Sequence, residues 1–263
     1  MNDVAIKIEN LRFSYGLRNA LKDITLTVRK GEYLSIVGPN GAGKTTLLKC
    51  VNRIYRGNTG SIQVAGKPLR QYSQKELACS VAYVPQASGR RRPPFTVYEY
   101  VMMARYPYLS PFSTVSPEDK KAVARALEET ETSPLADRYM DTLSGGECQK
   151  VYLAGALAQG VHILLLDEPT TFLDPKHEAD IQALLWRSNH KKSTTIVSVT
   201  HDINRATLAS DRVVAMKEGA IVFDGTSKEF MTNAVLEKIY SRSFIFTKHP
   251  QSDKTVIVPE CAI

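Results

Sequence analysis

The segment GPNGAGKT, residues 38–45, constrains the fold of this 263-residue chain more than any other stretch. It matches G-x-x-x-x-G-K-[ST], with an apolar run, YLSIV, before it and a helical pattern, TTLLKCV, after it. A strand, a glycine-rich turn and a helix in this order place backbone N–H groups around a phosphate, because glycine lets the main chain approach an anion closely. The chain is therefore predicted to be an α/β protein that binds a nucleoside triphosphate.

Each part of this loop has an expected contact with the nucleotide or its metal ion. The glycines let backbone N–H groups wrap the β-phosphate, Lys44 contacts the β- and γ-phosphates, and the Thr45 hydroxyl ligates Mg²⁺. The chain lacks the N-K-x-D motif with which a GTPase reads its base, so ATP and Mg²⁺ are the expected pair. The predicted nucleotide contacts are Gly38, Pro39, Asn40, Gly41, Ala42, Gly43, Lys44, Thr45 and Thr46.

A pair of acids follows a second apolar run, ILLLDE. At the end of a buried strand, Asp167 is expected to hold Mg²⁺ through water. Glu168 follows immediately and could polarise the attacking water as a general base. A solvated carboxylate pair with a structural role is the alternative, and the glycine-rich loop makes it the less favoured one.

A second helix start, LSGGE, also has the features of a phosphate site. Ser144 and Glu147 have the spacing of a capping box, with Ser144 as N-cap. Gly145 and Gly146 leave the first turn open to close approach, and the helix N-terminus attracts anions. Two such sites in one chain must either converge on one nucleotide or serve nucleotides held by different chains.

Five motifs in order, GPNGAGKT, LSGGE, ILLLDEP, TFLD and the histidine of VTHD, resemble the ATP-binding cassette of ABC proteins over essentially the whole chain. The resemblance implies the P-loop NTPase fold of ABC ATPases, with a RecA-like core, an N-terminal antiparallel β subdomain and an inserted helical subdomain. Residues 1–263 would form a single domain, with the helical subdomain at about 87–160 and a short C-terminal extension at about 226–263.

The same resemblance implies further roles around the nucleotide. Gln86, which closes VAYVPQ, would sense Mg²⁺, the attacking water and a membrane partner, and it is a candidate metal ligand. His201 would contact the γ-phosphate and hold Glu168 in position. Tyr15, in an alternating N-terminal strand, resembles the aromatic residue that stacks on adenine; a plain strand aromatic is the alternative.

A head-to-tail dimer of two chains is the second implication. Ser144, Gly145 and Gly146 would grip the γ-phosphate of ATP bound to the opposite subunit. Asp174, in TFLD, would cross the dimer interface. Some positions depart from the family pattern. Cys148 and Lys150 stand where arginines are usual, and Glu147 and Phe172 are also atypical.

The middle of the chain is similar to one class of these ATPases. FTVYEYVMMARYPYLSPF, SPEDKKAVARALEET and the ending YSRSFIFTKHPQSDKTVIVP resemble the ATPase subunits of importers for iron–siderophore chelates, haem and vitamin B12. The similarity implies an ATP-hydrolysing homodimer beneath integral membrane permease subunits, at the cytoplasmic face of the inner membrane, with an extracytoplasmic binding protein that delivers the ligand. A soluble cassette ATPase without a transport role, such as an iron–sulfur assembly factor, is the alternative.

Composition and charge narrow the remaining choices. A net charge of +7 indicates an anionic partner, which could be a nucleotide, a nucleic acid or lipid headgroups. The resemblance to importer subunits implies that no nucleic acid is a partner. No run of 18 apolar residues and no secretory signal is found, so no transmembrane helix is expected and the product should stay in the cytoplasm, where the resemblance implies a peripheral protein. Cys50, Cys79, Cys148 and Cys261 show no C-x-x-C spacing, which argues against disulfides and a zinc site. The basic run at 90–92 could contact lipid headgroups or a membrane subunit, although a solvated surface run is favoured.

Overall fold

The chain folds into two units, and each unit combines helices with strands. The computed structural model describes residues 3–57, 59–86, 92–110, 114–171, 173–250 and 253–258. The first unit is formed by Met1–Arg70 together with Thr195–Ile263, and the second by Gln71–Thr194. The chain therefore leaves the first unit once and returns to it.

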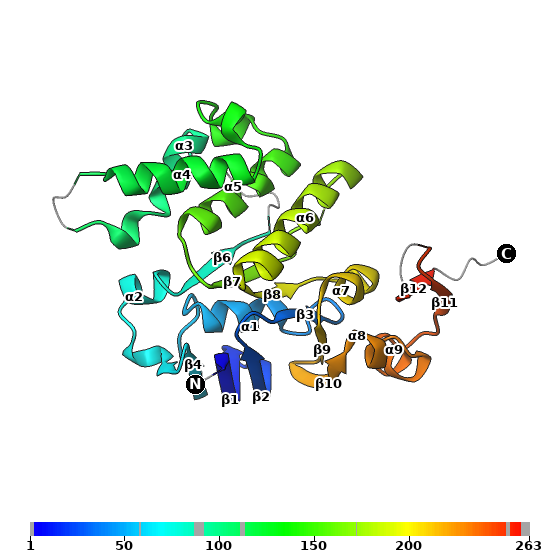
Figure 1. Cartoon of the computed structure of the whole chain (residues 1–263). Helices are drawn as coiled ribbons and strands as arrows, with labels where there is room; N and C mark the ends of the chain where they lie inside the picture. Colours follow the sequence, from blue (N-terminus) through cyan, green and yellow to red (C-terminus); the bar gives the residue numbers. More distant parts are fainter. Residues whose placement is uncertain are drawn as a thin grey trace. The chain divides into compact units, whose positions relative to one another are not determined.

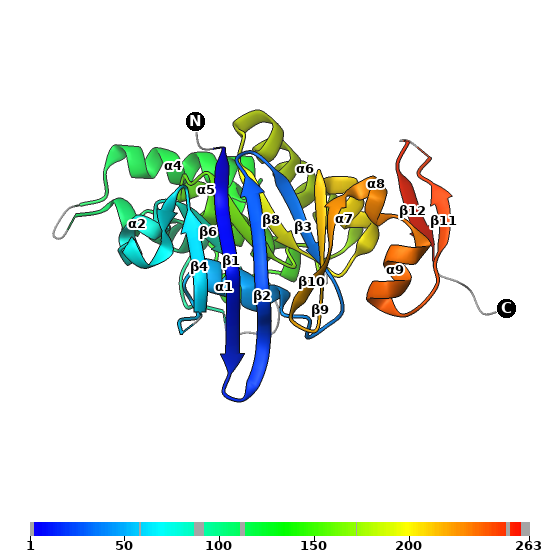
Figure 2. The ribbon, with the colours of Figure 1, turned by 90° about the horizontal axis from the view of Figure 1, so that it is seen from below.

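The N-terminal part of the first unit is an antiparallel sheet, as the alternating sequence predicts. Strands β1 (Val4–Tyr15) and β2 (Arg18–Arg29) pair antiparallel, and the sheet order is β2-β1-β4-β5. Figure 2 shows β1 between β2 and β4. Alternate side chains of β1 are buried because successive residues of a strand point to opposite faces. The later strands of this sheet are β4 (Thr59–Val64) and β5 (Lys67–Pro68).

The rest of the first unit is built on parallel strands. Strand β3 (Tyr33–Val37) pairs parallel with β8 (Thr195–Val199) on one side and with β9 (Arg212–Lys217) on the other. Every residue of β3 and β8 is buried, as expected for strands covered on both faces. Strand β10 (Ala220–Thr226) returns antiparallel to β9. Helix α1 (Lys44–Val51) follows β3 after the glycine-rich loop.

Short helices and a terminal hairpin complete this unit. The helices are α7 (Ile203–Ala209), α8 (Ser227–Phe230) and α9 (Asn233–Tyr240). The hairpin of β11 (Ile245–Lys248) and β12 (Thr255–Val258) lies beside α9 (Figure 2). Asn204 of α7 holds β12 by accepting a hydrogen bond from Ile257 N (2.7 Å) and donating one to Ile257 O (2.9 Å). The tail is thus attached through backbone groups that would otherwise lie at an open edge.

The second unit contains one parallel strand pair and a group of helices. Strands β6 (Val81–Val84) and β7 (Ile163–Asp167) are parallel. Figure 1 shows α3, α4 and α5 gathered together, and the same helices share a buried apolar cluster. The helices of this unit are α2 (Gln74–Ala78), α3 (Val97–Met103), α4 (Pro117–Glu129), α5 (Gly145–Ala158) and α6 (Pro175–Lys192), with 3₁₀ turns η1 (Leu69–Gln71, which begins in the first unit), η2 (Tyr106–Tyr108), η3 (Ser133–Leu135) and η4 (Met140–Thr142).

Helix caps and turns in this fold follow from local residue chemistry. Ser116 caps α4, with Pro117 as its first residue, because proline has no N–H to leave unsatisfied there. The hairpin between β9 and β10 turns at Glu218 and Gly219, both at positive φ. The helical segment expected at about 87–160 contains α3, α4 and α5, and its boundaries stay a prediction. None of the helices in the described ranges is long and apolar enough to cross a membrane.

Phe230 tests whether the first unit depends on its apolar cluster. Its side chain is fully buried among residues such as Val37, Ile203 and Val213. We expect Phe230→Ala to lower the free energy of unfolding by about 3–5 kcal/mol, because the cavity adds to the lost burial. Urea unfolding measures the change, and Leu17→Ala, at a fully exposed position, should stay within about 0.5 kcal/mol of the parent. Equal effects of Phe230→Ala and Leu17→Ala on the free energy of unfolding would show that the first unit does not depend on this apolar cluster.

Candidate functional site

Two glycines of the 38–45 loop allow its backbone to lie against neighbouring strands. Gly38 has φ 136°, and a Cβ there would lie 2.0 Å from the Met216 carbonyl oxygen of β9. Gly43 has φ 101°, and its Cβ would lie 2.6 Å from the Ala20 carbonyl oxygen of β2. A clash with backbone cannot be relieved by a rotamer change, so both positions require glycine. The loop is held by main chain contacts from two sheets of the first unit.

The start of α1 is arranged for an anion. Its N-cap, Gly43, provides no side-chain cap, and the first turn contains no acid. The Lys44 side chain is buried, and its ammonium donates to the carbonyl oxygens of Gly38 (2.7 Å) and Pro39 (3.0 Å). A buried ammonium over a loop, next to helix N–H groups without a side-chain cap, fits the phosphates of a nucleotide.

Tyr15 lies beside this helix start. Its hydroxyl is 3.1 Å from the Thr46 Oγ1 on α1, and its ring meets Phe13 edge-on at a centroid distance of 4.9 Å. Tyr55 packs against the same ring at 5.4 Å. The side chain is nevertheless 44% exposed. An oriented and partly exposed ring next to the phosphate loop is suited to stacking on a base.

The acid pair at the end of β7 is held by polar neighbours within the second unit. Asp167 is buried and accepts a hydrogen bond from the Tyr83 hydroxyl (2.9 Å). Glu168 accepts from Gln86 Nε2 (3.0 Å) and from Thr171 Oγ1 (3.0 Å). Glu168 also has φ 51°, a conformation that costs a glutamate of order 1 kcal/mol or more and that often marks a functional position.

The structure brings Gln86 and Glu168 within hydrogen-bond distance, and it adds two residues that sequence reasoning missed. Tyr83 faces Leu165 of β7 in the strand register, and its position as the only polar-tipped residue of VAYV could have pointed to it. Thr171 follows Glu168 by three residues, the spacing of a local side-chain contact.

The predicted capping box at the start of α5 is confirmed. Ser144 Oγ accepts from Glu147 N (3.2 Å), and Glu147 Oε2 accepts from Ser144 N (2.7 Å). The Ser144 N–H lowers the pKa of the Glu147 carboxyl below its usual range. Gly145 has open space where a Cβ would be. The glutamate at this atypical position therefore supports the helix start rather than weakening it.

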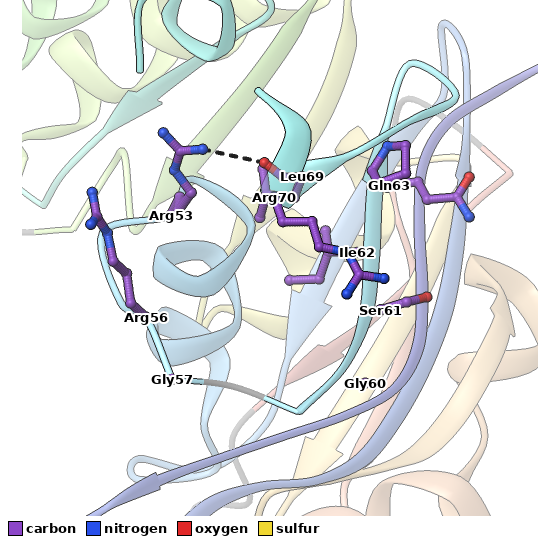
Figure 3. A pocket seen from close by; sticks show the side chains of 10 residues that line it. Arg53, Arg56, Gly57, Gly60, Ser61, Ile62, Gln63, Leu69 and Arg70 are labelled. Atoms are coloured by element: carbon purple, nitrogen blue, oxygen red, sulfur yellow. Dashed lines mark hydrogen bonds between the residues drawn. The ribbon is translucent and has the colours of Figure 1, made fainter. Parts of the chain in front are cut away.

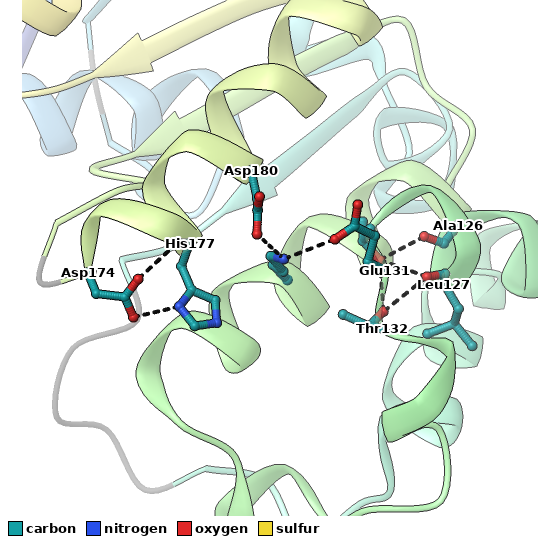
Figure 4. Close-up of polar contacts among 9 residues, drawn as sticks. Ala126, Leu127, Glu131, Thr132, Asp174, His177 and Asp180 are labelled. Atoms are coloured by element: carbon teal, nitrogen blue, oxygen red, sulfur yellow. Dashed lines mark hydrogen bonds and ion pairs between the residues drawn. The ribbon is translucent and has the colours of Figure 1, made fainter.

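His177 is a residue of this region that the motifs did not predict. Figure 4 shows Asp174 and His177 facing each other at the start of α6. Asp174 caps α6 by accepting from His177 N (3.0 Å), and its other oxygen lies 2.6 Å from His177 Nδ1. A Cβ on Gly146 would lie 2.5–2.9 Å from atoms of the His177 ring. The imidazole thus lies against the second glycine of LSGGE, and it connects the TFLD and LSGGE motifs within one unit.

The lysine at an unusual position also has a defined partner. Lys150 of α5 is buried, and its ammonium lies 2.5 Å from Asp180 of α6 and 3.5 Å from Glu131. The ammonium lowers the pKa of the Asp180 carboxyl. Cys148, the other departure, is buried in the apolar cluster of the helices. Neither residue leaves the start of α5 without support.

The remaining sequence predictions are distributed between the units. Residues 38–46, Tyr15 and His201 belong to the first unit, with His201 exposed just after β8. The second unit holds Gln86, Asp167, Glu168, Ser144, Gly145, Gly146 and Asp174. Of the basic run, Arg92 donates to the carbonyl oxygens of Leu143 and Met140, just before the capped helix. Arg90, Arg91, Phe172 and Cys261 lie outside the described residues.

Comparison with known proteins gives consistent matches. A family model described as "ABC transporter" matches residues 21–171. The iron(3+)-hydroxamate import ATP-binding protein FhuC of Bacillus subtilis (strain 168) is 38% identical over 256 residues, which cover 96% of this chain and 93% of that protein. The hemin import ATP-binding protein HmuV of Thermobifida fusca (strain YX) is 37% identical over 256 residues, which cover 97% of this chain and 89% of that protein.

Solved structures agree with these matches. A chain described as belonging to a metal-chelate type ABC transporter in an inward-facing conformation superposes with a TM-score of 0.84 at 26% identity, and 98% of each chain is covered. The ATP-binding cassette MJ0796, as a dimer in a post-hydrolysis state bound to ADP and Pi, gives a TM-score of 0.74 at 28% identity. That match covers 84% of this chain and 98% of the other.

The contact between Gly146 and His177 predicts a reversal of sign in a double-mutant cycle. Gly146→Ala alone should lower the thermal midpoint, because the methyl group would overlap the imidazole. In a His177→Ala background the same change should raise the midpoint, because alanine favours a helix over glycine by up to about 1 kcal/mol. Gly145→Ala, where space is open, should be stabilising in both backgrounds. Additive effects of Gly146→Ala and His177→Ala would show that the contact does not matter.

Proposed function

This chain belongs to the ABC transporter family as the ATP-hydrolysing subunit of an importer, and on that premise we propose that the cargo is an iron chelate, either a siderophore complex or haem, or vitamin B12. The likeness to iron-chelate and hemin import subunits over almost the whole chain carries the proposal. This likeness extends beyond the nucleotide motifs into the helical segment and the C-terminal tail. The soluble cassette ATPase considered from the sequence gains no support from these relatives.

In the proposed reaction ATP is the substrate and a water molecule attacks its γ-phosphorus. Lys44 and the N–H groups at the start of α1 neutralise the phosphate oxygens. Glu168, oriented by Gln86 and Thr171, accepts the proton of the water. Mg²⁺, held by Thr45, Asp167 and Gln86, would supply positive charge to the phosphate oxygens. ADP and phosphate are the products.

We assign the capped helix start to a second copy of the chain. In a head-to-tail homodimer, Ser144, Gly145 and Gly146 would close over the γ-phosphate held by the partner, since a helix N-terminus attracts an anion. Asp174 would reach the interface, with His177 maintaining its position beside Gly146. ATP binding then favours the closed dimer, and loss of the γ-phosphate reopens it, because a ligand shifts a population only by its differential affinity.

Two further residues complete the proposed nucleotide site. Tyr15 would stack on adenine, since its ring is oriented by Thr46 and Phe13 and remains partly exposed. His201 would contact the γ-phosphate and help to position Glu168. Asp202, the next residue, caps α7 by accepting from Arg205 N at 3.0 Å, so the chain direction after His201 is defined.

The chain acts as a peripheral membrane protein with permease partners, as import ATP-binding subunits do. We place it at the cytoplasmic face of the inner membrane, as a homodimer beneath integral permease subunits. An extracytoplasmic binding protein would deliver the cargo to those subunits. The helical segment of the second unit, with exposed Tyr106 and Met103, is suited to contact the permease, since such apolar side chains favour a protein interface. No nucleic acid is part of this proposal.

The role of Glu168 is tested by Glu168→Gln. The amide keeps the size of the side chain but cannot accept the proton, so turnover should fall by a factor of about 100 or more while ATP still binds. With ATP and Mg²⁺ the variant should elute as a dimer in size-exclusion chromatography. Glu118→Gln, an exposed position on α4, serves as the control with unchanged turnover. Normal turnover by Glu168→Gln would remove Glu168 from the mechanism.

The cargo class is tested by capture of the transporter. Tagged Glu168→Gln is recovered from gently solubilised membranes with ATP and Mg²⁺, and the permease and its binding protein are identified by mass spectrometry. We expect the purified binding protein to take up a ferric siderophore, haem or vitamin B12, measured by quenching of its tryptophan fluorescence. Recovery with cytosolic proteins only would reject the importer, and a binding protein specific for a sugar or an amino acid would reject the cargo class.

A further inference from the structure

A cavity of about 300 Å³ in the first unit is lined by three arginines (Figure 3). Arg53 and Arg56 come from the segment that follows α1, and Arg70 comes from the other side, after β5. Ile62 and Leu69, both buried, contribute apolar lining. Among the residues that the structure describes, no carboxylate lines this cavity. None of its lining residues belongs to the nucleotide motifs.

Arg53 occupies a backbone position that normally favours glycine. Helix α1 ends in two reverse hydrogen bonds, from Arg53 N to Cys50 O (3.0 Å) and from Ile54 N to Lys49 O (2.9 Å). This is the Schellman pattern, in which the residue after the C-cap adopts the left-handed conformation and is usually glycine. Arg53 has φ 56° there. A non-glycine residue is strained by roughly 1 kcal/mol at such a position.

The Arg53 side chain is directed by the opposite wall. Its Nη1 donates to the Leu69 carbonyl oxygen at 3.3 Å, and the side chain is half-buried. This bond joins the end of α1 to the segment that carries Arg70, as Figure 3 shows. One guanidinium is therefore held in place beside the cavity before any ligand arrives, which lowers the entropy lost on binding.

Two of the three arginines at the cavity have no ion-pair partner among the residues that the structure describes. Arg56 and Arg70 are exposed, and within the described ranges neither forms an ion pair. One lining residue, Ser61, donates to a carboxylate, Glu9 (2.9 Å), but Glu9 is already paired with Lys7 at 2.6 Å. The negative end of the α1 dipole favours nearby cations. The dipole explains the two arginines that follow α1, Arg53 and Arg56. It does not explain Arg70, which comes from another element.

We propose that this cavity binds a phosphate group, carried either by a small phosphorylated molecule or by the headgroup of an acidic phospholipid. Guanidinium groups match phosphate because each offers a planar fork of N–H donors to two oxygens. A phosphate presents several oxygens and up to two charges to three arginines, whereas one carboxylate presents two oxygens and one charge. The site is separate from the nucleotide loop, because α1, whose eight residues span about 12 Å, begins at Lys44 and ends just before the turn that carries Arg53.

The first measurement is direct binding of glycerol 3-phosphate by isothermal titration calorimetry. The intact protein is first saturated with Mg²⁺ and a non-hydrolysable ATP analogue, so that the loop at 38–45 is occupied. We expect one site per chain. The double variant Arg56→Gln/Arg70→Gln should bind at least tenfold more weakly, because two charge-assisted partners are lost. The matched control, Lys120→Gln/Lys121→Gln, removes the same charge from the exposed face of α4 and should bind as the parent does.

Arg53→Gly separates a role in binding from a role in folding. Glycine relieves the left-handed conformation, so the thermal midpoint should not fall. Loss of the guanidinium should still weaken binding of glycerol 3-phosphate by at least tenfold. A variant that folds as well as the parent and binds as well would overturn the proposal.

Vesicles distinguish the two sources of phosphate. The same variants are floated with vesicles of phosphatidylcholine, alone or with phosphatidylglycerol. Flotation with phosphatidylglycerol that is lost in the arginine variants and kept in the lysine control identifies a lipid headgroup. Binding of glycerol 3-phosphate without such flotation identifies a soluble ligand. The proposal fails if the arginine variants and the lysine control bind glycerol 3-phosphate and phosphatidylglycerol vesicles equally. It also fails if an acidic peptide of aspartate and glutamate binds in an arginine-dependent way and the two phosphate probes do not bind.

Discussion

The contact of the 38–45 backbone with two neighbouring strands is the constraint on which the nucleotide site depends. Gly38 and Gly43 lie so close to the carbonyl oxygens of Met216 and Ala20 that any Cβ would overlap them. The loop is therefore positioned by main chain, and Lys44 is held over it by carbonyl groups of the loop itself. These contacts lie within the chain and need no ligand. Preorganised donors of this kind stabilise developing charge without reorganising at the moment of reaction.

The two helix starts that are proposed to bind phosphate are capped differently. Helix α1 begins at Gly43 without a side-chain cap, and in the proposed function its N-terminus binds the phosphates of ATP held by the same chain. Helix α5 begins with a complete capping box, and its two glycines make the first turn accessible. The cap keeps the second start folded in the absence of phosphate. This difference is consistent with a site that must wait for a nucleotide brought by another copy of the chain.

Contacts around α6 show how the motifs are supported by residues that have no motif of their own. His177 fills the space above Gly146 and is oriented by Asp174, while Lys150 and Asp180 join α5 to α6 about one turn further along. Tyr83 and Thr171 play the same part for Asp167 and Glu168. His177, Lys150 and Tyr83 were not predicted, because their contacts depend on which side chains meet across two elements, whereas the spacing of Thr171 from Glu168 is local. Sequence spacing reports only neighbours along one element.

The sequence by itself determined the strand–loop–helix order, the hairpins, the caps at Ser116 and Ser144, and the identity of the nucleotide motifs. Those features follow from local periodicity, from glycine and proline geometry, and from side chains that reach their own backbone. Only the tertiary structure decided that Gln86 orients Glu168, that an imidazole requires a glycine at 146, and that three arginines from two segments share one cavity. These are contacts between residues far apart in the chain. Their geometry is set by how strands and helices pack, and no local pattern encodes that packing.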